Sequence, residues 1–169
     1  MEQNTKLRSS YHVPVLLPQA LEVLNIAPVK RYIDATLGGG GHAAEIIRRG
    51  GKLLGIDADR DAVMFARSYF KSQVPNLTEG VDWKIVQGNF RDIVDIAKRE
   101  GFGAVDGVLL DLGVSSHQLD TASRGFSYRF PDAPLDLRLS RDTQQFTAAD
   151  VVRGSSEKEL YEILATYGE

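Results

Sequence analysis

Short apolar runs of strand length alternate with amphipathic stretches through the N-terminal part of the chain. Strands are predicted at 31–36, 52–57, 82–87 and 105–111, and helices near 17–24, 42–49, 60–72 and 91–100. After the first helix, strands and helices alternate, which specifies a parallel sheet with helices on both faces. We therefore predict an α/β fold with about four parallel strands, whose ligands bind beyond the carboxyl ends of the strands.

The pattern changes in the C-terminal part of the chain. Residues 117–145 contain prolines, glycine and paired charges without a clear period, whereas 147–152 and 156–166 again have the pattern of helices. We therefore divide the chain into residues 1–116, the N-terminal part of an α/β domain with its ligand site at the strand ends, and residues 117–169, an insertion or the start of a second, helical subdomain.

The composition narrows the class of protein. The 169 residues are 43% hydrophobic, enough for the core of one domain, and no apolar run approaches the ~20 residues of a membrane span. The first ten residues are polar and lack the features of a signal or transit peptide, so we expect a cytoplasmic protein. There is no cysteine and the three histidines lie far apart, so we predict no metal site. A net charge of -3 with interspersed signs argues mildly against a nucleic-acid partner.

Four consecutive glycines begin at Gly38 and join the first predicted strand to the next helix. Without side chains the backbone can approach a ligand, and the helix presents free N–H groups at its amino end. Two interpretations are open. The G-x-G-x-x-A spacing from Gly38, with Asp57 at about the 20-residue distance of a ribose-binding acid, fits a dinucleotide site. Asp34 followed by the glycines instead resembles the first motif of S-adenosylmethionine methyltransferases, in which Asp57 again binds the ribose.

Two further residues follow later strands. Phe90, after the third strand, offers an aromatic face to an adenine or packs at the start of the following helix. Asp111, at the end of the fourth strand, lies where a methyl group would be delivered, although a lone aspartate at such a position is commonly a turn or cap residue. S-adenosylmethionine needs its adenine bound and its methyl group aimed at a nucleophile, so Phe90 and Asp111 together with Asp57 favour a methyltransferase.

Five ordered motifs make this interpretation specific. They are His12-Val-Pro-Val-Leu-Leu17, Asp34-Ala-Thr-Leu-Gly-Gly-Gly-Gly-His42, Gly107-Val-Leu-Leu-Asp-Leu-Gly-Val-Ser-Ser-His-Gln-Leu-Asp120, Arg124-Gly-Phe-Ser127 and Pro134-Leu-Asp-Leu-Arg138. Together they resemble the RsmH (MraW) family of small-subunit ribosomal-RNA cytosine-N4 methyltransferases. The resemblance covers residues 11–169 and implies a Rossmann-like S-adenosylmethionine methyltransferase sheet. It carries the family's cofactor contacts over to Gly40, Gly41, His42, Asp57, Phe90, Asp111 and Gln118.

The resemblance also implies a reaction and a substrate. The family uses S-adenosyl-L-methionine to methylate a cytidine in the decoding (P-site) region of 16S rRNA, within the small ribosomal subunit. Family members continue beyond the position of Glu169 and return with further strands, so we expect a chain truncated to roughly the N-terminal half. Such a chain could bind the cofactor without turnover. An NAD(P)-dependent oxidoreductase is the other alternative, but it leaves the Asp-Leu-Gly-Val-Ser-Ser segment at Asp111 unexplained.

The chemistry of the substrate assigns a role to Asp111. The lone pair of the cytosine amine is delocalised into the ring, so the enzyme must accept hydrogen bonds from the amine and hold it in line with the methyl–sulfur bond. No covalent nucleophile is required. Our hypothesis is that Asp111 and nearby backbone carbonyls orient the cofactor and the amine of a cytidine taken out of its stack.

Two surfaces have open interpretations. With only four strands, the fourth is an uncovered edge, which predicts dimerisation or aggregation through it.

The segment after Ser116 interleaves aromatic and cationic side chains, which suits either a single-stranded RNA platform or a structural lid in which pairs such as Asp136 and Arg138 reach backbone groups. The side chains concerned are Arg124, Phe126, Tyr128, Arg129, Phe130, Arg138 and Arg141.

Overall fold

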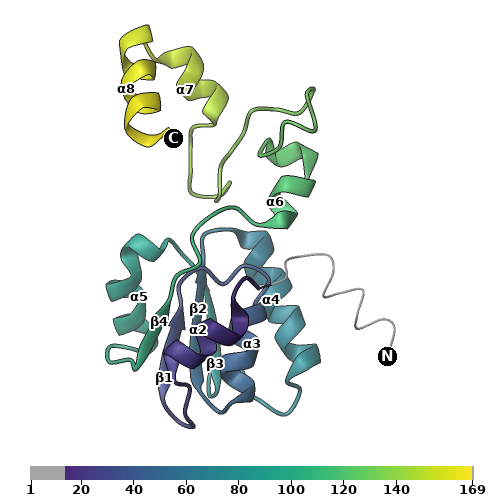
Figure 1. The fold of residues 1–169 in the computed structure, drawn as a ribbon, viewed down its shortest axis with the longest axis vertical. Coiled ribbons are helices and arrows are strands. Elements are labelled where there is room, and N and C mark those ends of the chain that lie inside the picture. The colour runs from purple at the N-terminus through teal and green to yellow at the C-terminus, as the bar shows by residue number, and fades with distance from the viewer. Residues whose placement is uncertain (1–13, 169) are drawn as a thin grey trace. The chain divides into compact units, whose positions relative to one another are not determined.

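The computed structural model describes residues 14–168, and the chain divides into two compact units at the bond between Ser115 and Ser116 (Figure 1). The first unit contains α2 (Leu17–Leu24), β1 (Arg31–Asp34), α3 (Gly41–Arg48), β2 (Lys52–Asp57), α4 (Arg60–Gln73), β3 (Trp83–Gln87), η1 (Phe90–Asp92), α5 (Ile93–Glu100) and β4 (Gly107–Leu109). The second contains α6 (Ser116–Asp120), η2 (Ala122–Arg124), α7 (Ala148–Gly154) and α8 (Glu157–Tyr167).

The four strands form one parallel sheet in the order β3-β2-β1-β4, which confirms the predicted fold class. The chain passes from β1 to β2 on one side, and β4 pairs with the other side of β1. Strand order therefore reverses between β1 and β4, which is where ligands bind in open α/β sheets. All four predicted strands are present, but β1 ends at Asp34 and β4 is limited to Gly107–Leu109, because the pairing between them stops at Asp34 and Leu109.

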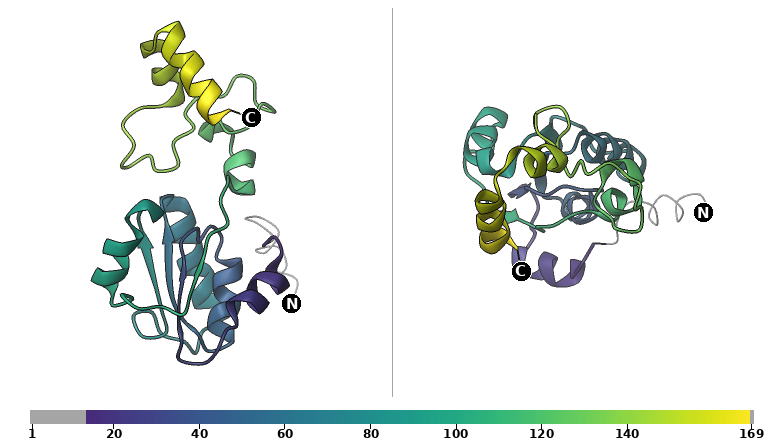
Figure 2. Two further views of the ribbon diagram at one scale, coloured as in Figure 1. Left: turned by 60° about the vertical axis from the view of Figure 1, so that its left-hand side comes forward. Right: turned by 90° about the horizontal axis from the view of Figure 1, so that it is seen from above.

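Both faces of the sheet are covered, as a parallel sheet requires. Figure 2 (left) shows α5 on one side of the sheet and α2, α3 and α4 on the other. The side chains alternate accordingly. Tyr32, Leu53 and Ile85 join the core under α2, α3 and α4, whereas Ile33, Leu54 and Ile56 join the core under α5. Trp83 is 2% exposed and packs edge-on against Phe70, with the ring centroids 5.3 Å apart.

Helices α7 and α8 of the second unit begin at side-chain caps. Thr147 and Asp150 form a capping box at the start of α7, and Ser156 and Glu159 form another at the start of α8. These two helices confirm the elements predicted at 147–152 and 156–166. The short α6 and η2 were not predicted, because five and three residues are too few to show a helical period.

The edge strand β4 and the residues just after it have exposed apolar side chains. In and just after β4, Val108 is 41% exposed, Leu110 49% and Leu112 68%. β4 pairs with β1 alone among the described strands, so its outer backbone groups form an open edge. None of the helices within residues 14–168 is long and apolar enough to cross a membrane.

Candidate functional site

The glycine turn connects β1 to α3 at the carboxyl end of the sheet. Its backbone is fixed by hydrogen bonds from Leu37 N–H to the Ile56 carbonyl (3.0 Å) and from Gly40 N–H to the Leu37 carbonyl (2.8 Å). Gly40 is the residue before α3 and has a φ of +78°, and a Cβ there would lie 2.7 Å from Cε1 of Phe70 in α4. Glycine is therefore required at position 40 for both its backbone conformation and its close packing.

Asp57, the last residue of β2, is bound to this turn. One carboxylate oxygen accepts the N–H of Gly38 at 2.7 Å and the other accepts the N–H of Asp59 at 2.9 Å. Burial raises the pKa of Asp57, and the hydrogen bonds from the backbone of Asp59 and Gly38 oppose that rise. Each oxygen still has acceptor capacity for one further donor, so the carboxylate can accept two hydroxyl groups of a ligand.

Asp34 lies at the end of the neighbouring strand and is 2% exposed. Its Oδ1 accepts the N–H of Thr36 at 3.2 Å. The pKa of Asp34 is raised to about 7, chiefly by burial; the hydrogen bond from the Thr36 N–H opposes the rise, and the charges of Asp57 and Asp111 contribute to it. The carboxylates of Asp57 and Asp111, from the ends of the two strands beside β1, thus lie close enough to Asp34 to act on its charge.

Asp111 follows β4 and is exposed. Its N–H donates to Oγ1 of Thr36 at 2.7 Å, a contact between residues 75 positions apart in the sequence. Thr36 was not predicted as a site residue, because a threonine near the end of a strand has no pattern from which this contact could be inferred.

Phe90 and His42 occupy different environments. Phe90 begins η1 after β3 and is 42% exposed, so part of its ring is available to a ligand.

The His42 ring is buried at 7% exposure, and its Nε2 lies 3.1 Å from the carbonyl oxygen of Val15. A carbonyl can only accept, so Nε2 carries the proton and the ring attaches α3 to the segment before α2. The backbone N–H of His42, in the first turn of α3, is the group that can face a ligand.

The predicted site residues fall into both units. Six of them lie at or after strand ends in the first unit: Gly40, Gly41, His42, Asp57, Phe90 and Asp111. Gln118 belongs to α6 of the second unit and is 5% exposed. Among the described residues, no group of three or more histidine, aspartate or glutamate side chains could hold a metal ion.

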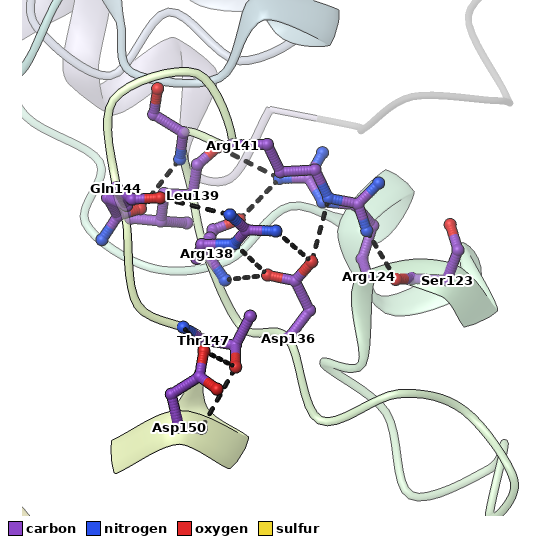
Figure 3. A network of polar contacts seen from close by, with 10 residues as sticks. Ser123, Arg124, Asp136, Arg138, Leu139, Arg141, Gln144, Thr147 and Asp150 are labelled. Atoms are coloured by element: carbon purple, nitrogen blue, oxygen red, sulfur yellow. Dashed lines mark hydrogen bonds and ion pairs between the residues drawn. The ribbon is translucent and has the colours of Figure 1, made fainter. Parts of the chain in front are cut away.

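Three arginines of the second unit, Arg124, Arg138 and Arg141, belong to a polar network around Asp136 (Figure 3). The Asp136 carboxylate, on a residue 8% exposed, accepts from Arg138 at 2.7 and 3.1 Å and pairs with Arg141 at 3.2 Å. The hydrogen bond from Arg138 lowers the pKa of Asp136. Arg124 is 2% exposed and donates to the carbonyls of Arg138 and Leu139, and Arg141 donates to that of Ser123. These contacts match the structural interpretation of the segment for these three arginines.

The fold and the strand order define the class of the first unit as a Rossmann-like α/β domain, with a glycine turn and three aspartates at the carboxyl ends of its strands. Within that class the chain belongs to the MraW methylase family, whose model matches residues 9–169.

Curated relatives agree with this assignment. Ribosomal RNA small subunit methyltransferase H of Symbiobacterium thermophilum is 46% identical over 162 residues, which cover 94% of this chain and 48% of that protein. The protein of the same name from Cytophaga hutchinsonii is 48% identical over 161 residues, covering 94% and 50%. The chain thus spans about half the length of the curated relatives it matches. Among solved structures, a putative O-methyltransferase from Klebsiella pneumoniae overlaps with 97% of this chain and 74% of its own, at 17% identity and a TM-score of 0.43.

Proposed function

We propose that this chain supplies the S-adenosyl-L-methionine-binding part of an enzyme that methylates N4 of a cytidine in the decoding region of 16S rRNA. The observation that carries the proposal is membership in the MraW methylase family, together with relatives named as small-subunit ribosomal RNA methyltransferases. The partner is then the small ribosomal subunit, and the protein works in the cytoplasm, where that subunit is found.

The residues at the strand ends fit this cofactor. The Asp57 carboxylate is held by two backbone N–H groups and has capacity for the two ribose hydroxyls. The half-exposed ring of Phe90 can stack on the adenine, and Gly40 and Gly41 admit the ligand close to the backbone. We assign the backbone N–H of His42 and the side chain of Gln118 as further cofactor contacts. When bound, S-adenosyl-L-methionine supplies an electrophilic methyl group.

Asp111 is the residue we assign to the reacting amine. It is exposed at the strand-order reversal, and its backbone is anchored to Thr36. Its carboxylate accepts a hydrogen bond from the N4 amine as the amine loses its planarity, which directs the nitrogen lone pair toward the methyl group. The target base reaches the site only if it is taken out of its stack.

A second candidate function is cofactor binding without turnover by this chain alone. It is supported by the chain's coverage of about half of its relatives' length. A third candidate, an NAD(P)-dependent oxidoreductase, depends only on the glycine spacing and the distance from it to Asp57.

Calorimetry with S-adenosylmethionine, S-adenosylhomocysteine and NAD tests these functions on the chain itself. We expect the two adenosyl ligands to bind and NAD not to bind. Asp57→Ala should weaken binding by at least roughly a hundredfold, because two hydrogen bonds to a charged acceptor are lost. The exposed Asp95→Asn in α5 is the matched control and should bind normally.

Turnover separates the first two candidates. Small subunits that lack the methyl group are incubated with this chain or with a full-length relative and labelled S-adenosylmethionine. Methyl transfer by the relative and not by this chain would assign it cofactor binding alone. NAD binding without binding of the adenosyl ligands would contradict the methyltransferase proposal.

A further inference from the structure

The pairing between β1 and β4 ends in an unusual contact. The last backbone hydrogen bond between the two segments runs from Ala35 N–H to the Leu109 carbonyl at 2.9 Å. In a continued parallel ladder, the N–H of Asp111 would donate to a backbone carbonyl of the β1 segment. It donates instead to Oγ1 of Thr36 at 2.7 Å. A side chain therefore replaces the backbone at the point where the two strands separate.

The backbone of Thr36 is itself held in place by the carboxylate of Asp34. Its N–H donates to Oδ1 of the buried Asp34 at 3.2 Å, so its backbone is tied to the end of β1. The β-branched side chain of threonine has few allowed χ1 rotamers, which limits where Oγ1 can lie. Asp34, Thr36 and Asp111 thus form a chain of contacts from the core of the sheet to an exposed residue.

This chain of contacts lies where the strand order reverses, between β1 and β4. Strands must separate there to admit a ligand between the loops that follow them. Separation removes the backbone ladder that would otherwise fix the segment after β4. The Thr36 hydroxyl restores one attachment to that segment, at the residue whose carboxylate we assign to the reacting amine.

We propose that Thr36 is a positioning residue for methyl transfer, because its hydroxyl fixes the backbone of Asp111 at the strand-order reversal. This inference rests on the proposed function, since it concerns how Asp111 is held for the cofactor and the amine. A threonine that merely ended β1 would need no hydroxyl, and valine, which has the same shape and the same branching, would serve equally well.

The matched pair Thr36→Val and Thr36→Ser isolates the hydroxyl. Valine keeps the volume and removes the acceptor, so the Asp111 N–H turns to water and the segment after β4 gains freedom. Serine keeps the acceptor and removes only a methyl group. We expect Thr36→Val to speed amide hydrogen exchange at Asp111, and to weaken S-adenosylhomocysteine binding, each by roughly three- to tenfold. Thr36→Ser should restore both to within about twofold.

The experiment measures exchange at the Asp111 amide by nitrogen-15 NMR and S-adenosylhomocysteine affinity by calorimetry, on the whole chain. Trp83 fluorescence confirms that each variant is folded. Unchanged exchange in Thr36→Val would overturn the contact, and faster exchange with unchanged affinity would overturn the positioning role. Failure of Thr36→Ser to restore affinity would also overturn it. Absence of binding by the unmutated chain would instead refute the proposed function, so the two failures are distinguishable.

Discussion

Replacing the buried Asp34 by asparagine should stabilise the first unit increasingly as the pH rises. The pKa of Asp34 is raised from 3.8 to about 7, chiefly by burial. Between these values the folded protein keeps a proton that the unfolded chain has released. The stability of the unmutated protein therefore falls as the pH rises from about 4 to about 7, and this contribution stays at its lowest value above about 7.

The magnitude follows from the size of the shift. A rise of about three pKa units, at about 1.4 kcal/mol each, corresponds to ~4 kcal/mol of folding free energy lost when Asp34 is ionised. Asparagine carries no charge and keeps an oxygen for the Thr36 N–H, but its buried NH2 group adds a cost of about 1–3 kcal/mol if it finds no acceptor. That cost does not depend on pH. The gain from Asp34→Asn should therefore be about 2–3 kcal/mol larger at pH 8 than at pH 5.

Urea unfolding followed by Trp83 fluorescence provides the assay. Trp83 is the single tryptophan and is buried in β3, so it reports on the first unit. Comparing each variant with the unmutated chain at the same pH cancels the titration of other groups. Asp95→Asn, at an exposed position on α5, serves as the control and should show no change between pH 5 and pH 8. An equal effect of Asp34→Asn at both pH values would refute the reasoning.

Two further predictions concern the second unit and the sheet edge. Gly125 has a φ of +75°, and a Cβ there would lie 2.2 Å from the Pro134 carbonyl oxygen. Gly125→Ala should therefore displace the backbone and speed limited proteolysis within residues 125–146, and a digestion rate equal to that of the unmutated chain would contradict this. Because β4 is an open edge with Val108 exposed, we predict self-association of the chain through β4. Sedimentation should show dimers that Val108→Lys dissociates and Val108→Ile does not, and a monomer at every concentration would rule out this interface.

The periodic elements of the fold could be predicted from the sequence, because each depends on a local pattern. The four strands and the helices around them follow from apolar runs and helical spacing, and they are confirmed. The ends of β1 and β4 could not be predicted. Residues 105–111 are apolar enough for a longer strand, but pairing ends at Leu109 because the backbone of Asp111 bonds to a side chain instead.

In the candidate site, too, some contacts could be predicted from the sequence and others could not. The hydrogen bond from the Gly38 N–H to the Asp57 carboxylate joins the glycine turn to an acid at a strand end. Both were predicted from the sequence, so the location of this contact could be anticipated. The role of the His42 ring could not, since its partner is the carbonyl of Val15, and every residue offers a carbonyl. Thr36 was missed for a related reason, because its partner is a backbone N–H. A side-chain contact to a distant backbone group therefore cannot be predicted from residue identity unless both segments carry a recognisable motif, as Gly38 and Asp57 do.

The arginines after Ser116 illustrate why composition alone cannot assign an RNA surface. Alternating arginine and aromatic residues suit stacking on bases, but the same guanidinium groups can donate to carbonyls of a loop that lacks a ladder of its own. In this structure Arg124 and Arg141 donate to backbone carbonyls, and Arg138 is bound to Asp136. Moving them onto phosphates would remove hydrogen bonds that hold the loop. If the proposed RNA substrate contacts this unit, its contacts are to be sought at exposed side chains outside this network, such as Tyr128, which is 97% exposed.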